Sequence, residues 1–221
     1  MGTLTLVRHG QASFGADDYD RLSELGHRQS VRLGEHFRRR GLVFDAVLTG
    51  TLKRHRQTLA GIAEGLQAEL VPLVWPGLDE YRPEALIATV HAAPLKKPTN
   101  ADEVRHHFRL LRQGLAAWME GRAEPEGMPC WADFLAGVTS ALDHVRARHH
   151  GAQVLAVSSG GPISAAVAQV LGVPAAGCIE LNLRIRNTGV SEFVFTPTRH
   201  QLLSFNGIAH LDDVPDWVTY A

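Results

Sequence analysis

Short apolar segments alternate along the chain with longer segments in which apolar and charged residues are mixed. Residues 3–7, 46–49 and 153–157 are rich in Val, Leu or Thr, and each run ends at a polar or glycine-containing turn. Continuous apolar runs of this length are typical of strands buried on both faces, as in a parallel sheet. Residues 189–195 and 201–205 are predicted to be two further strands that close the sheet.

The mixed segments have the periodicity of helices. Residues 23–40, 52–66 and 132–149 carry apolar positions at helical spacing, and Gly41 follows the first segment as a stop signal. Alternation of strands and helices predicts an α/β fold with three layers, α/β/α, around a mostly parallel central sheet. A further β-type run, residues 70–74, lies between the second and third of these helices.

Residues 91–128 differ from the rest of the chain. They hold a proline-rich stretch, a charged helical pattern over residues 102–120 and a second turn-forming stretch at residues 124–127. We interpret this segment as a small helical cap, or lid, inserted into one domain that spans residues 1–221.

Composition narrows the classes of function. The chain has 221 residues, 45% hydrophobic, with 22 basic against 23 acidic residues, so it lacks the basic excess typical of nucleic-acid binders. Cys130 and Cys178 form no CxxC pattern, and no HExxH motif, P-loop or GxGxxG is present. The sequence has no apolar run long enough to span a membrane. We expect a cytoplasmic protein that binds neither nucleic acid nor membrane and holds no metal.

The first strand runs directly into Arg8-His9-Gly10. Loops at the carboxyl ends of strands in open α/β sheets converge on a crevice that holds catalytic groups. An unprotonated imidazole nitrogen of His9 can attack phosphorus if the other nitrogen is held by an acceptor. Arg8 supplies the planar guanidinium that matches phosphate oxygens, and Gly10 lets the backbone approach the anion.

Two further residues follow the next strands. Arg54 comes after the second strand, where a helix begins, and could bind the same phosphate from the first helical turn. Glu80 follows the run at residues 70–74, and a carboxyl group in the crevice could protonate a leaving oxygen. Lys53 and Arg56 are interpreted as a solvated basic face.

The ordered set of motifs resembles the histidine phosphatase superfamily, which includes phosphoglycerate mutases and the bisphosphatase domain of fructose-2,6-bisphosphatase. The motifs that carry this resemblance are Arg8-His9-Gly10, Leu22-Ser23-x-Leu25-Gly26-x-x-Gln29, Leu52-x-Arg54-x-x-Gln57-Thr58, Leu78-x-Glu80, Gly160-Gly161 and Asn206-x-x-x-His210-Leu211. They extend over nearly the whole chain.

The resemblance implies that His9 is the phosphorylated nucleophile, that Arg8 and Arg54 bind phosphate, and that Glu80 is the proton donor. It implies no metal or organic cofactor for hydrolysis, and a small phosphorylated substrate or inorganic phosphate as the ligand. His210 of the closing motif is interpreted as structural.

Ser159 stands where this family normally has a second catalytic histidine, in Val157-Ser158-Ser159-Gly160-Gly161. Its hydroxyl can still donate to the phosphate, and we expect the backbone amides of the following helix to be available to the anion. Loss of one such donor typically slows a reaction about 10²–10³-fold, so we expect a phosphoric monoester hydrolase of reduced rate. If the site is otherwise intact, Ser159→His should raise the rate; an unchanged or lower rate would mean that the site has been rebuilt around the serine.

Other readings stay open. His106-His107 and His149-His150 could in principle replace the missing histidine, but they are interpreted as surface and helix-end residues. A catalytically inactive protein that binds a phosphorylated ligand, and a phosphoglycerate-mutase-like phosphotransferase, remain alternative functions. A serine hydrolase that uses Ser159 is disfavoured, because Val157 occupies the first glycine position of Gly-x-Ser-x-Gly.

Overall fold

The computed structural model describes residues 1–13, 20–93, 95–96 and 98–220. Its strands are β1 (Gly2–Arg8), β2 (Ala46–Thr49), β3 (Leu73–Val74), β4 (Gln153–Ser158), β5 (Val190–Phe195) and β6 (His200–Gly207). The α-helices are α1 (Glu24–Arg39), α2 (Lys53–Leu66), α3 (Pro83–Ala88), α4 (Ala101–Met119), α5 (Trp131–Arg148), α6 (Gly160–Leu171) and α7 (Ala175–Asn182). Short 3₁₀ helices are η1 (Pro76–Leu78), η2 (Ala209–Leu211) and η3 (Pro215–Trp217).

The strands form one six-stranded sheet in the order β3-β2-β4-β1-β5-β6. β1 and β2 both pair in parallel with β4, and β2 pairs in parallel with β3. β5 is antiparallel to β1, and β6 is antiparallel to β5. The predicted α/β fold with a mostly parallel sheet is therefore confirmed.

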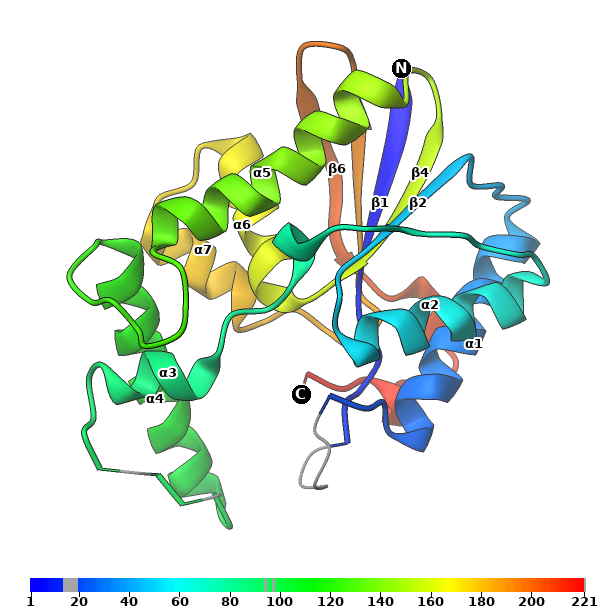
Figure 1. Ribbon diagram of the computed structural model, residues 1–221. Coiled ribbons are helices and arrows are strands. Elements are labelled where there is room, and N and C mark those ends of the chain that lie inside the picture. The colour runs from blue at the N-terminus through cyan, green and yellow to red at the C-terminus, as the bar shows by residue number, and fades with distance from the viewer. Residues whose placement is uncertain (14–19, 94, 97, 221) are drawn as a thin grey trace.

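Helices cover both faces of this sheet (Figure 1). Side chains that alternate along the strands divide between two clusters of buried residues, as the pleat requires. Leu155 and Val157 of β4 pack with Leu33 of α1 and Ile62 of α2, whereas Ala156 belongs to the cluster on the opposite face. That opposite cluster includes residues from α4, α5, α6 and α7. Burial on both faces accounts for the continuous apolar pattern of the central strands.

Local signals place the ends of α1. The Ser23 side chain accepts a hydrogen bond from the Gly26 N–H at 3.0 Å and so caps the amino terminus. At the other end, Gly41 has φ +66°, a left-handed conformation that glycine adopts readily and that ends the helix.

The prediction of a strand over residues 70–74 is wrong for residues 70–72. Only Leu73 and Val74 pair with β2, at the edge of the sheet. Pro72 has no N–H to donate to a strand ladder, which explains why pairing begins after it. The short helices α3 and α7 were not predicted from the sequence.

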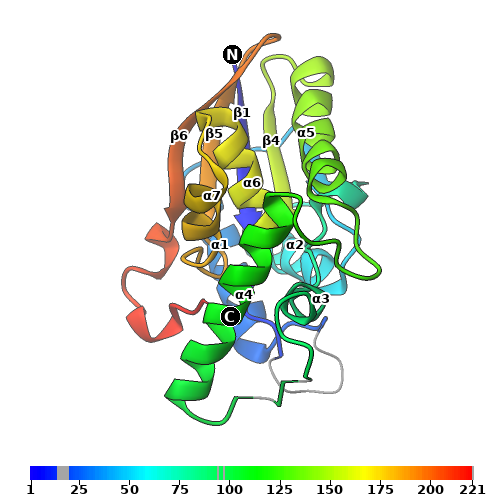
Figure 2. The same cartoon turned by 90° about the vertical axis from the view of Figure 1, so that its left-hand side faces the viewer.

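The segment interpreted as a cap contains α4. Toward its carboxyl end, Leu115 and Trp118 are buried in the core, whereas most residues of its first half are exposed. Figures 1 and 2 show α3 and α4 extending beyond the end of the sheet at which β1 terminates. Residues 94 and 97 of this segment lie outside the described residues, and its motion as a lid stays a prediction. No helix in the described ranges is both long and apolar enough to cross a membrane.

Candidate active site

Three strands end side by side where the motif residues lie. In the parallel ladders Arg8 pairs with Ser158, and Thr49 pairs with Val157. Because β4 lies between β1 and β2, the residues that follow these strands emerge next to one another. His9 comes after β1, Ser159 comes after β4, and α2 begins shortly after β2.

His9 is held rigidly at this edge. Its backbone N–H donates to the Ser158 carbonyl at 2.9 Å, and its carbonyl accepts from the Asn187 side chain at 3.2 Å. Its Nδ1 lies 2.7 Å from the Gly10 carbonyl oxygen. A carbonyl only accepts, so Nδ1 carries the proton and Nε2 of the neutral ring has a free lone pair.

Burial holds the pKa of His9 well below its ordinary value, and the guanidinium groups of Arg8 and Arg54 lower it further. Only 4% of the residue is exposed. The imidazole is therefore neutral near pH 7, which is the state that a nucleophile requires.

Both predicted arginines lie at this site. Arg54 is the second residue of α2, and its guanidinium donates to Asp20 at 2.8 Å. Asp20 also accepts from the Lys53 backbone N–H at 2.8 Å, which satisfies one donor at the start of the helix. Arg8 donates to the carbonyls of Ile185 at 2.5 Å and Tyr220 at 2.6 Å. These contacts orient both guanidinium groups beside His9.

Glu80, in the loop after η1, contacts the amino terminus of α6. Its carboxylate oxygens accept from the Gly161 N–H at 3.1 and 3.3 Å. The expectation that the amides of this helix are available to an anion is therefore wrong for Gly161, because Glu80 occupies that amide. A Cβ on Gly161 would lie 2.3 Å from Glu80 Oε1, so only glycine permits this approach.

Burial raises the pKa of Glu80, although Arg54, the Gly161 amide and Arg8 act in the opposite direction. The effect of both guanidinium groups on its pKa also places this carboxyl group close to the phosphate-binding residues. A carboxyl group with a raised pKa is suited to hold and donate a proton.

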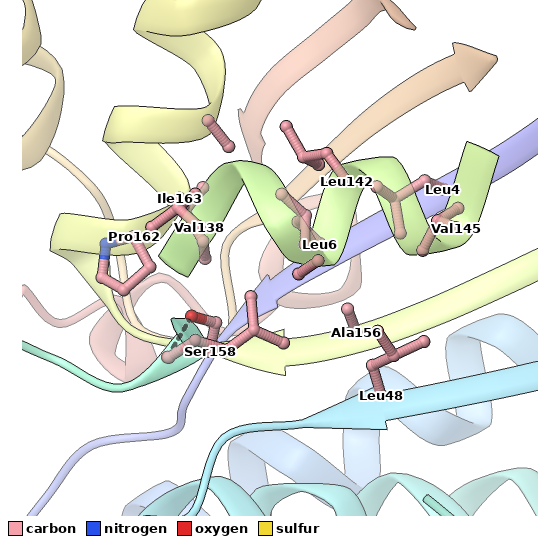
Figure 3. Close-up of a pocket in the computed structure, with 13 residues that line it drawn as sticks. Leu4, Leu6, Leu48, Val138, Leu142, Val145, Ala156, Ser158, Pro162 and Ile163 are labelled. Atoms are coloured by element: carbon pink, nitrogen blue, oxygen red, sulfur yellow. Dashed lines mark hydrogen bonds between the residues drawn. The ribbon is translucent and has the colours of Figure 1, made fainter. Parts of the chain in front are cut away.

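The loop that carries Glu80 is tied to the end of β4. The Ser158 hydroxyl donates to the Leu78 carbonyl at 2.7 Å, and both groups are buried. Figure 3 shows this hydrogen bond at the margin of an apolar cavity between the sheet and helices α5 and α6. The cavity holds about 10 Å³, the lower limit for one water, so it is a gap in core packing.

Ser159 contacts a residue that the sequence did not single out. Its Oγ lies 2.7 Å from Nε2 of His55, the third residue of α2. The His55 ring centroid is 5.8 Å from that of His9. His55 therefore fills the space beside Ser159, so the site is not one in which Ser159 could simply be enlarged.

A family model described as the histidine phosphatase superfamily (branch 1) matches residues 4–207. The chain belongs to this superfamily. A broad-specificity phosphatase of Saccharomyces cerevisiae is 36% identical over 76 residues, which cover 31% of this chain and 33% of the yeast protein. The match thus spans about a third of that relative's length.

Several solved structures share this fold. A phosphoserine phosphatase mutant from Entamoeba histolytica, in complex with phosphoserine, has a TM-score of 0.64 at 19% identity and covers 96% of this chain and 100% of its own. A phosphoglycerate mutase from Bacillus anthracis has a TM-score of 0.67 at 17% identity, and the match covers 95% of this chain and 94% of the mutase chain. Identities this low show the fold alone. The superfamily match and the similarity to the yeast phosphatase support a phosphatase reaction at the level of class.

The five residues predicted from the sequence meet at one site in this histidine phosphatase fold. Arg8, His9, Arg54, Glu80 and Ser159 all lie at the carboxyl-terminal edge of the sheet. His210 lies 2.9 Å from the Thr188 hydroxyl, and the Thr188 backbone N–H donates to the Arg8 carbonyl at 3.1 Å, so His210 supports the loop next to the end of β1. Among the described residues, no group of three or more His, Cys, Asp or Glu side chains could hold a metal ion.

Proposed function

We propose that this protein hydrolyses a phosphomonoester through a phosphohistidine intermediate on His9. The substrate phosphate lies between the guanidinium groups of Arg8 and Arg54, with the Ser159 hydroxyl as a further donor. A bidentate guanidinium neutralises the charge on phosphate oxygens and orients the phosphorus toward the nucleophile. Phosphoryl transfer depends mainly on this positioning and charge neutralisation.

In the first step, the lone pair of His9 Nε2 attacks phosphorus. An N–P bond forms, the P–O bond to the leaving group breaks, and the carboxyl proton of Glu80 passes to the leaving alkoxide. In the second step, water attacks the phosphohistidine while the Glu80 carboxylate accepts a proton from it. The N–P bond breaks, inorganic phosphate leaves, and both residues return to their starting states.

The observation that carries the proposal is the hydrogen bond between His9 Nδ1 and the Gly10 carbonyl at 2.7 Å. It fixes the tautomer in which Nε2 is the nucleophile, while burial lowers the pKa of His9 and keeps the ring neutral. A histidine that served only to bind an anion would gain from being charged. The environment of His9 favours the neutral ring and therefore supports catalysis.

Hydrolysis of para-nitrophenyl phosphate by His9→Ala tests the proposal. The variant should lose at least about 10³-fold in kcat, because it removes the imidazole nitrogen that attacks phosphorus. His27→Ala, which alters a histidine with 52% of its side chain exposed on α1, is the matched control and should keep the wild-type rate. Activity in His9→Ala at the wild-type level would rule out the nucleophile, and tight phosphate binding without turnover in the wild type would support a non-catalytic binder.

A further inference from the structure

A buried chain of polar side chains stands next to the proposed nucleophile. It consists of Ser159, His55 and Asp79, which come from the end of β4, the first turn of α2 and the loop after η1. Ser159 and His55 are both 0% exposed, and their Oγ and Nε2 atoms are 2.7 Å apart. On the other side of the ring, His55 Nδ1 lies 3.6 Å from Asp79 Oδ1.

The surroundings are arranged to hold this chain. Asp79 is oriented by Thr51, whose backbone N–H donates to Oδ1 at 2.6 Å and whose hydroxyl donates to Oδ2. Gly50 leaves room for the ring, because a Cβ there would lie 2.3 Å from His55 Nδ1 and 2.5 Å from Asp79 Oδ1. The approach of the imidazole to the carboxylate therefore depends on glycine at this position.

A role in packing alone does not account for His55. Its Nδ1 is buried and has no hydrogen-bond partner in the part of the chain that the structure describes. A buried polar atom without a partner destabilises the fold, and an aliphatic side chain would fill the same space without that cost.

The neutral ring cannot satisfy both of its neighbours. If the proton is on Nδ1, it faces Asp79, but Nε2 then accepts the Ser159 hydroxyl proton and turns it away from any substrate. If the proton is on Nε2, the Ser159 hydroxyl is free to donate, but the Nδ1 lone pair faces a carboxylate. The imidazolium, with a proton on each nitrogen, directs one N–H toward the Asp79 carboxylate at 3.6 Å and donates the other to Ser159.

We propose that His55 in its imidazolium form acts through Ser159 on the bound phosphoryl group. His55 Nε2–H donates to Ser159 Oγ, and the Ser159 hydroxyl donates to a phosphoryl oxygen. The pair thereby supplies the charge-assisted hydrogen bond that the family resemblance assigns to a histidine at position 159. This inference rests on the proposed function for the location of the phosphoryl group, and it makes His55 a positioning residue.

The charges that face His55 explain why the proton arrives with the ligand. Burial and the guanidinium of Arg54 hold the pKa of His55 at about 3 in the unliganded protein. His9 faces it from the end of β1, and the Asp79 carboxylate lies beyond direct hydrogen-bond distance. A phosphate dianion brings opposite charge into the buried site and raises the pKa of His55. The proton comes from water or from the monoanionic form of the ligand.

The first test is NMR of ¹⁵N-histidine-labelled wild-type protein, titrated at neutral pH with inorganic phosphate. The His55 ring is assigned by the loss of its signals in His55→Gln. Both ring nitrogens should move to imidazolium shifts as phosphate saturates the site, and Ser159→Ala should weaken the change. A ring that stays neutral at saturation overturns the proposal. This readout does not depend on turnover, so it separates failure of the relay from failure of the proposed function.

The second test is kinetic. His55→Gln keeps a side-chain donor but no charge, and it should lower kcat about 10–100-fold, part of the loss typical of one removed donor, with little change in KM. Ser159→Ala should be affected similarly, and the double variant should be no slower than the slower single variant, because both changes interrupt one relay. His27→Gln is the matched control. Wild-type kcat in His55→Gln, or losses that multiply in the double variant, would overturn the relay.

Discussion

Replacing Ser159 by histidine places a second imidazole beside His55 in a part of the site that solvent does not reach. Both residues are 0% exposed, and Ser159 Oγ already lies 2.7 Å from His55 Nε2. Inserting extra atoms into a well-packed interior typically costs about 1–3 kcal/mol. For a chain of this size, each kcal/mol lowers Tm by about 2–4 °C, so Ser159→His should melt about 2–12 °C below the wild type.

The same variant should also be slower than the wild type, because the new ring displaces His55 and the first turn of α2 that carries Arg54. The double variant His55→Ala/Ser159→His removes the ring that obstructs the new one. It should recover Tm and exceed the kcat/KM of both single variants, since one imidazole again stands beside the phosphoryl group. The sequence alone had favoured a faster enzyme from Ser159→His; the occupied space beside Ser159 reverses that prediction.

Thermal unfolding by circular dichroism and initial rates with para-nitrophenyl phosphate measure the two effects on the same preparations. Ser159→Ala serves as the control for loss of the hydroxyl without added volume. A Ser159→His variant that is as stable as the wild type and faster would refute the reasoning, because it would show that the site accommodates imidazoles at positions 55 and 159 together.

Three further predictions concern Glu80. Burial lowers the pKa of His9 well below 6.5 and raises the pKa of Glu80 above 4.5. The pH profile of kcat/KM should therefore have an acid limb, due to protonation of His9, with its midpoint well below pH 6.5. Its alkaline limb, due to ionisation of Glu80, should have its midpoint above pH 4.5. Glu80→Gln should abolish the alkaline fall and slow an alkyl phosphate far more than para-nitrophenyl phosphate, whose leaving group needs no proton; equal losses would argue against a proton donor. Gly161→Ala would place a Cβ 2.3 Å from Glu80 Oε1, and it should lower kcat on the alkyl phosphate at least about 10-fold by displacing the carboxyl group. Gly207→Ala is the control, because the nearest atom to a Cβ there is 3.6 Å away. An unchanged rate in Gly161→Ala would show that the position of Glu80 does not matter.

Much of the site could be predicted because it follows the ends of strands. Arg8-His9 and Ser159 follow runs of apolar residues that signal buried strands, and parallel strands bring their carboxyl ends to one edge. Arg54 was predictable for the same reason, since it opens the helix after β2. In each case a local pattern determines the three-dimensional position.

His55 was not predicted as a site residue because the sequence around it is basic. It lies between Arg54 and Arg56 in a basic run that is typical of a solvated face, yet it is fully buried while Arg56 is exposed. The signal that could have identified it is its helical spacing from Thr58 and Ile62, which are also buried. Spacing alone does not reveal a contact with Ser159, which is 104 positions away.

Two other features of the site were not predicted because they depend on contacts between segments far apart in the sequence. The Tyr220 carbonyl accepts from Arg8 across 212 positions, and no local pattern indicates it. The Gly161 amide is occupied by Glu80, which approaches from a loop 81 positions earlier. Only the tertiary packing of the loop against α6 determines that this helix start binds a carboxylate of the protein itself.

The most direct test of the central claim is to trap the phosphorylated enzyme. The wild-type protein is mixed with a phosphomonoester, quenched in alkali within one turnover, and digested for mass spectrometry of the peptide that contains His9. The account predicts one phosphoryl group on His9, stable in alkali and lost in acid, and its absence from His9→Ala. Turnover with no phosphorylated His9, or with the phosphoryl group on Ser159 instead, would contradict it.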